Sequence, residues 1–271
     1  MEIAIEHSTV HIYEHPVRYG VQELRLTPPN TPSQQVLDWR IEMPGIEGAA
    51  KWFDAWGNLV HLVNQTREHS DLEIRVTGLV GTSDADGIIG ELPNSPTPRI
   101  FVRETPLTRA DRSLSAIAAS LEGKHRDQIA LYHALMEAIR ERVEFDAGQT
   151  DMTTSAADAL KSGHGVCQDF AHIFLSVCRR LDLPARYVTG YLVVREGDVG
   201  AEAQHAWVEA DVAGLGWVGF DPANGICPDD HYVRLACGLD AADAAPIRGI
   251  RRGSGTDTLS VSVSVLKQTQ Q

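Results

Sequence analysis

The chain has 271 residues, of which 43% are hydrophobic and 23% charged, as in folded globular proteins, so a disordered chain is excluded. Its formal net charge of −13 repels nucleic-acid phosphates and anionic lipid surfaces, and we expect neither nucleic acid nor a membrane as partner. No apolar run approaches the roughly 20 residues that span a bilayer. The first residues lack the pattern of a secretory signal, which favours a cytoplasmic location.

The first hundred residues are β-rich. Short apolar and β-branched runs, separated by turns rich in Pro, Gly and Asn, predict strands near residues 3–12, 17–26, 36–43, 59–63 and 72–80. No amphipathic helix of normal length fits this region, so an antiparallel sheet or sandwich is expected. Residues 84–98 are rich in Gly and Pro and predict a linker. We therefore divide the chain into a β-rich domain, residues 1–105, and a second domain, residues 106–271.

Helical periodicity begins after this boundary. Apolar residues between 132 and 143 recur at helical spacing, and a second helix is predicted to begin at Ser155, with Asp158 as capping-box partner. A third helix is expected over residues 166–181, with Cys178 on its apolar stripe. Strands are then predicted over residues 186–194, in a hairpin over 205–212 and 217–220, and over 259–266. The fold class is therefore α+β.

Cys167 has the most favourable position for chemistry among the four cysteines. The run Gly163-His164-Gly165-Val166-Cys167 leads directly into the third predicted helix. A helix N-terminus carries free N–H groups and a partial positive charge, and both favour a thiolate. Cys178 is expected to be a core residue. Cys227 and Cys237 lie in loop-like sequence without a supporting frame.

A thiolate nucleophile needs a base that can take up a proton and later return it. His205 begins a predicted strand, and histidine can do both near neutral pH. Asp221 closes the next strand of the hairpin, so it could hold the other ring nitrogen of His205. Taken singly, such a Cys, His or Asp is more often structural, and it is the order of the three that indicates acyl-transfer chemistry.

Three segments resemble the core of the bacterial transglutaminase-like superfamily: GVCQDFAHIFLSVCRRLDLPARYVTGY, HAWVE and GWVGFDPANG. The N-terminal ELRLTPP and DAWGN and the C-terminal PIRGIRRG are similar to the other parts of bacterial members. The resemblance implies a papain-like core, with a helix packed on an antiparallel sheet or barrel, after a sandwich-like N-terminal domain. It also implies a catalytic triad of Cys167, His205 and Asp221.

The resemblance leaves the reaction open between hydrolysis, by a protease or amidase, and transfer to an amine. In either case a protein or peptide amide is the expected substrate, through a thioester on Cys167. Candidates for contacts to substrate or oxyanion are Gln168, Gln204 and Trp207. His172 is expected to be structural, and Tyr191 to pack near the site. No cofactor or metal is expected, and no calcium-binding loop is found in the sequence.

Two alternatives stay open. A non-catalytic binding module on the same fold would be expected to have lost a triad residue, whereas all three are present. A zinc site is the second alternative, because His164, Cys167, His205 and Asp221 supply a mixed donor set that can hold that metal.

Overall fold

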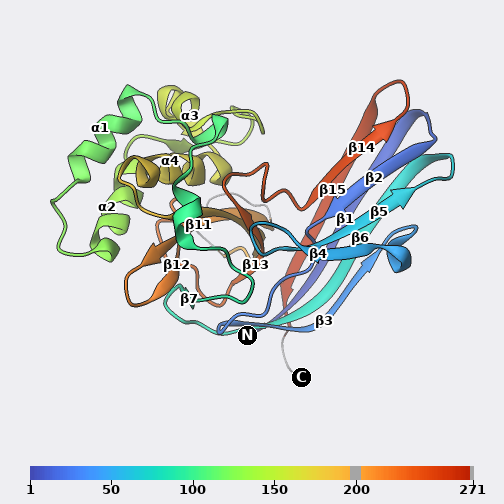
Figure 1. Ribbon diagram of the computed structural model, residues 1–271, viewed down its shortest axis with the longest axis horizontal. Helices are drawn as coiled ribbons and strands as arrows, with labels where there is room; N and C mark the ends of the chain where they lie inside the picture. Colours follow the sequence, from blue (N-terminus) through green and yellow to red (C-terminus); the bar gives the residue numbers. More distant parts are fainter. Residues whose placement is uncertain (196–202, 269–271) are drawn as a thin grey trace.

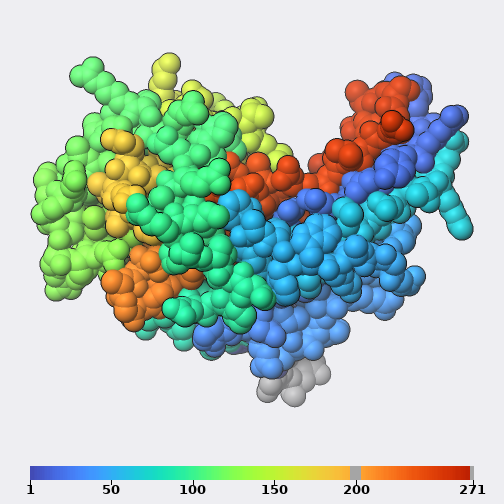
Figure 2. All heavy atoms as spheres, in the orientation of Figure 1, coloured from blue at the N-terminus to red at the C-terminus, as the bar shows by residue number. Residues whose placement is uncertain are grey.

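The computed structural model describes residues 1–195 and 203–268. It has a β-sandwich on one side and a body of helices and strands on the other (Figure 1). The space-filling view shows a broad notch between the helices and the tip of the sandwich that carries β14 (Figure 2). In the described part of the chain, no helix is long and apolar enough to cross a membrane. The cytoplasmic location stays a prediction.

The sandwich consists of two antiparallel four-stranded sheets that enclose a buried apolar core. The first sheet has the order β15-β1-β6-β3, with bounds Asp257–Lys267, Glu2–Val17, His69–Thr82 and Gln34–Glu42. The second has the order β14-β2-β5-β4, with bounds Ile247–Arg252, Tyr19–Leu24, Leu59–Gln65 and Ala50–Phe53. Strands from both ends of the chain therefore build the sandwich.

The second body has one antiparallel sheet of order β13-β10-β11-β12-β7, with bounds Tyr232–Gly238, Ala185–Leu192, Gln204–Val212, Gly216–Phe220 and Ile88–Gly90. Four helices accompany it, α1 (Arg112–Leu121), α2 (Gln128–Arg140), α3 (Ala156–Ser162) and α4 (Cys167–Arg180). A short parallel pair, β8 (Glu144–Phe145) and β9 (His164–Gly165), precedes α4. Short 3-10 turns lie at Ile46–Gly48, Pro98–Val102 and Pro106–Thr108.

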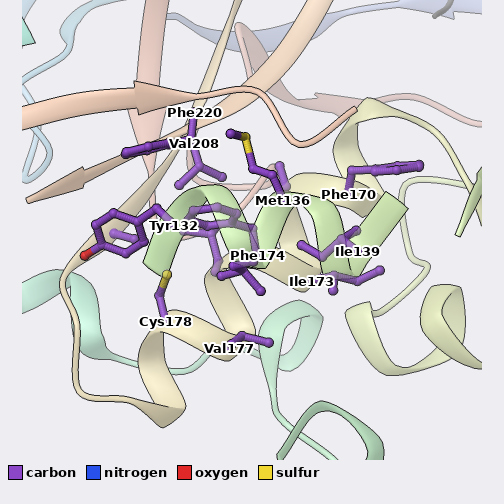
Figure 3. Close-up of a cluster of buried hydrophobic side chains, with 14 of the residues drawn as sticks. Tyr132, Met136, Ile139, Phe170, Ile173, Phe174, Val177, Cys178, Val208 and Phe220 are labelled. Carbon is purple, nitrogen blue, oxygen red and sulfur yellow. The ribbon is translucent and has the colours of Figure 1, made fainter. Parts of the chain in front are cut away.

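Helix α4 lies at the centre of this body and is buried along most of its length. Phe174 stacks on Phe220 of β12, with ring centroids 5.9 Å apart, and Tyr132 of α2 packs on the same ring at 5.0 Å (Figure 3). Cys178 is fully buried in this cluster, as the apolar stripe predicts. This packing fixes the start of α4 relative to β11 and β12.

The expected α+β class, the three predicted helices and the hairpin of β11 and β12 are all confirmed. Helix α1 and strands β4, β13 and β14 were not predicted. The expected linker contains β7, which pairs with β12, and β14 and β15 pair with β2 and β1. The sheets therefore exchange strands across the predicted boundary at residue 105.

Candidate active site

Cys167 is the first residue of α4, and two glycines shape the chain before it. Gly163 ends α3 in the left-handed region at φ 74°, which favours glycine. A Cβ on Gly165 would lie 2.7 Å from Cβ of Asp169, so only glycine fits without movement. Because the first N–H groups of a helix have no intrahelical acceptor, the start of α4 offers donors and positive potential beside the half-buried sulfur.

Asp169 fixes this turn from within the helix. Its Oδ2 accepts hydrogen bonds from the Val166 backbone N–H at 2.8 Å and from the Thr150 hydroxyl at 2.6 Å. Burial raises the pKa of Asp169, although both hydrogen bonds oppose that rise. Neither Asp169 nor Thr150 was predicted as part of the site. The signal for Asp169 was its place three residues after the N-cap, where a capping acid belongs.

His205 and Asp221 form a buried pair near the ends of the neighbouring strands β11 and β12. Nε2 of His205 lies 2.7 Å from Oδ2 of Asp221, and the two side chains are 4% and 0% exposed. The geometry follows from the β11–β12 hairpin, since His205 is the second residue of β11 and Asp221 directly follows β12. With Nε2 occupied, Nδ1 is the ring nitrogen left for Cys167.

Charge pairing and hydrogen bonding together outweigh burial in the titration of this site. Burial alone would lower the pKa of His205, but the Asp221 carboxylate and hydrogen bonding to Asp221 and Cys167 raise it to about 10. Burial would likewise raise the pKa of Asp221, whereas His205 and further hydrogen bonds hold it below its ordinary value. At neutral pH the pair is therefore an imidazolium and a carboxylate.

Three further residues hold the Asp221 carboxylate through four donor groups. Its Oδ1 accepts from the backbone N–H groups of Ala223 and Asn224 at 3.0 and 3.2 Å. Its Oδ2 accepts from the Asn224 side-chain amide at 2.9 Å and from the Tyr232 hydroxyl at 2.8 Å. Sequence reasoning missed Tyr232, because it lies on the unpredicted strand β13. Asn224 had a usable signal, because it sits in the turn directly after Asp221-Pro222.

The candidates for substrate contacts are spread around the triad. Gln168 is the second residue of α4 and is half-buried, and Gln204 directly precedes His205 and is also half-buried. Trp207 is 2% exposed, stacks on His205 with ring centroids 6.4 Å apart, and packs edge-on against Tyr232. Trp207 therefore forms a wall behind the imidazole, while the two glutamines stay candidates for polar contacts.

The structure agrees with the expectation for His172 but not with that for Tyr191. His172 is fully buried, accepts a hydrogen bond from the Ala241 backbone N–H and packs on Tyr187, as expected of a structural residue. Burial lowers the pKa of His172 to about 4, so it stays neutral. The expectation for Tyr191 was wrong, because its side chain belongs to the sandwich core and its hydroxyl contacts His7 at 3.0 Å.

The residues of the alternative zinc site are not gathered as ligands. Among the described residues, no three of His164, Cys167, His205 and Asp221 bring their donor atoms within 4.8 Å of one another. Asp229, Asp230 and His231 do so, but Asp229 already pairs with Arg195. The zinc alternative therefore has no gathered ligand set among the described residues.

Comparisons with known proteins agree with this arrangement. A family model described as "Transglutaminase-like superfamily" matches residues 115–222, and one described as "Bacterial transglutaminase-like N-terminal region" matches residues 3–81. An uncharacterized protein of Mycobacterium leprae is 30% identical, with 97% of this chain and 98% of that protein covered. An uncharacterized protein of Mycobacterium tuberculosis is 27% identical, with coverage of 97% and 91%.

One solved structure is similar over the whole chain. It is the crystal structure of a candidate cysteine protease from Cytophaga hutchinsonii, which is 26% identical with a TM-score of 0.76. The similarity covers 100% of this chain and 92% of that one. Sandwich and core thus occur together in a solved relative.

Proposed function

Because the chain belongs to the transglutaminase-like superfamily, we propose that it is a thiol enzyme that cleaves peptide or glutamine-type amides. Cys167 is the nucleophile, His205 the acid and base, and Asp221 the group that orients His205. The observation that carries this proposal is the buried 2.7 Å contact between His205 and Asp221 beside the start of α4. The similarity to the Cytophaga hutchinsonii protein supports it.

The chemistry proceeds in two steps. The Cys167 thiolate attacks the amide carbonyl, and the C–N bond breaks as the His205 imidazolium protonates the leaving amine. This leaves a thioester on Cys167 and a neutral imidazole. His205 then takes a proton from water as the oxygen attacks the thioester, and the C–S bond breaks to release a carboxylic acid. Amine transfer would differ only in the second nucleophile.

Stabilisation of the developing oxyanion is assigned to the start of α4. The backbone N–H of Cys167 has no intrahelical acceptor at this position, and the helix dipole favours negative charge there. Gln168 and Gln204 are proposed as the side chains from which a second donor comes. We favour hydrolysis over amine transfer because water is abundant and nothing in the sequence marks an amine-donor pocket.

The proposal is tested by incubating the protein with glutamine-containing peptides, with and without a primary amine, and reading products by mass spectrometry. Hydrolysis converts glutamine to glutamate or cleaves the peptide, whereas transfer attaches the amine. Cys167→Ala should abolish every product, while the matched variant Cys227→Ala should keep activity because Cys227 lies outside the triad. Full activity in Cys167→Ala would refute the proposal, whereas a wild-type protein that forms no product would leave the binding-module alternative.

A further inference from the structure

A cavity of about 280 Å³ lies where the sandwich, residues 92–95 and the core sheet meet. Its wall is mainly apolar, with Pro28, Phe53, Trp56, Leu59 and Leu92 among the residues that form it. The segments around residues 53–59 and 92–95 adjoin on the face shown in Figure 2. Cys167, His205 and Asp221 do not line it, so it is distinct from the candidate active site.

Two buried arginines line this apolar cavity. Arg186 of β10 is 0% exposed and Arg234 of β13 is 7% exposed. Both bind one fully buried carboxylate, Glu209 of β11: Nε of Arg186 lies 2.6 Å from Oε2, and Nε of Arg234 lies 2.8 Å from Oε1. The two arginines and the one glutamate are buried together on the face of the sheet that carries Trp207.

The charges of this group do not balance. Within residues 1–195 and 203–268, Glu209 is the one carboxylate in ion-pair contact with either arginine. The half-buried Asp211 interacts electrostatically with Arg186 but lies too far from it to form an ion pair. Two cations therefore share one anion, which leaves a single excess positive charge in a largely apolar setting. Burying such a charge is costly unless a further anion completes the group.

Arg186 also has an unused donor. Its Nη1 donates to the Ser95 hydroxyl at 3.0 Å, and its guanidinium lies 3.9 Å from the centre of the Trp217 ring. Its Nη2 is buried and has no hydrogen-bond partner among the described residues. Buried donors are rarely left unsatisfied, so this one calls for a partner, which a water or an anion can supply.

We propose that this cavity binds a carboxylate attached to a small apolar group. The unused Nη2 donor of Arg186 matches a carboxylate oxygen, the single excess charge matches a monoanion, and the wall matches an aromatic or branched aliphatic body. Because a water occupies about 30 Å³, the cavity has room for a ligand of roughly ten non-hydrogen atoms. The inference is independent of the thiol chemistry at Cys167.

Calorimetric titration of the full-length protein tests this with two matched pairs of probes. Phenylacetate is compared with phenylacetamide, and N-acetylvaline with its amide, since each amide keeps the shape and removes the charge. We expect at least one acid to bind at least tenfold more tightly than its amide. A preference for N-acetylvaline would identify the ligand as a peptide C-terminus, and a preference for phenylacetate as a free acid. Equal binding of acid and amide, or no binding of either acid at millimolar concentration, would overturn the proposal.

Variants place the binding at this cavity. Arg186→Met removes the cation, and Leu92→Trp fills the cavity without changing the charge, so each should weaken acid binding at least tenfold. Leu92→Trp also keeps the test valid should Arg186→Met fail to fold. The controls are Arg99→Met, at an exposed ion pair with Asp182, and Leu215→Trp, at an exposed turn, and both should bind like wild type. Folded Leu92→Trp that binds the acid with wild-type affinity would overturn the site.

Discussion

Tyr232 and His205 share one acceptor atom. The Tyr232 hydroxyl lies 2.8 Å from Oδ2 of Asp221, and Nε2 of His205 lies 2.7 Å from the same oxygen. Tyr232 therefore fixes the carboxylate that fixes the imidazole, and it does so from β13, at the edge of the core sheet. The position of the base thus depends on three strands.

Tyr232→Phe should lower kcat/KM by about tenfold, because one neutral donor to the carboxylate is lost while the ion pair remains. The ring is kept, so its packing against His205 and Trp207 should persist. Steady-state kinetics on the peptide substrate measure the effect. A change in KM with unaltered kcat would instead place Tyr232 in substrate binding.

Asp221→Ala should have a larger effect. Without the carboxylate, burial is the dominant influence on His205, and its pKa should fall from about 10 to below the ordinary 6.5. Wild-type kcat/KM should decline on the alkaline side near pH 10, as the imidazolium that protonates the leaving amine is lost. In the variant this limb should move below pH 7, and kcat/KM at neutral pH should fall by about 10²–10⁴-fold. An unmoved alkaline limb would contradict the role of Asp221.

The same pair makes stability depend on pH. Since the folded pKa of His205 is raised, its contribution is fully present below pH 6.5 and is lost as pH rises through about 10. The unfolding free energy of wild type, measured by denaturant titration, should therefore fall toward that of His205→Gln over this range. A difference between the two proteins that does not change from pH 6 to pH 10 would count against the ion pair.

Thr150→Val tests the turn before Cys167. The substitution keeps the shape but removes the hydroxyl that donates to Asp169, and should lower the unfolding free energy by about 1 kcal/mol. Asp169→Ala also removes the acceptor of the Val166 N–H and should cost about 1–3 kcal/mol. Both variants should lower kcat and change KM less, because they loosen the start of α4. Unchanged kinetics in a destabilised Asp169→Ala would limit Asp169 to a structural role.

Gly190 of β10 leaves open the space that the Trp207 ring needs in order to stack on the His205 imidazole. A Cβ there would lie 2.1 Å from the Val233 carbonyl oxygen and 2.6 Å from the Trp207 ring, which stacks on His205. Gly190→Ala should cost about 1–3 kcal/mol and lower kcat/KM. Gly81→Ala in β6 is the matched control, because its Cβ would meet its nearest atom at 3.6 Å. Equal stability of the two variants would contradict the packing.

Local patterns made part of this structure predictable. The apolar spacing in α2, the Ser155 cap of α3 and the position of Cys167 before an apolar stripe are all properties of neighbouring residues. The approach of His205 and Asp221 followed from a short hairpin. These are contacts that a few residues of sequence can specify.

The parts that were missed depend on distant residues. Strands β14 and β15 pair with β2 and β1 at the other end of the chain, and no local sequence pattern predicts such a distant strand partner. Strand β13 is buried along its length, so it lacks the alternation of a half-exposed strand, and Tyr232 was missed with it. The group of Arg186, Glu209 and Arg234 likewise forms only when three strands meet.

The reactivity of Cys167 tests the central claim most directly. The wild-type protein is treated with iodoacetamide at neutral pH, and labelling of each cysteine is followed by peptide mass spectrometry. Cys167 should be alkylated well before Cys227, whose pKa burial raises to about 11, and before the fully buried Cys178. In Asp221→Ala this advantage should largely disappear. Labelling of Cys167 no faster than that of Cys178 in the folded wild-type protein would contradict the assignment of Cys167 as the nucleophile.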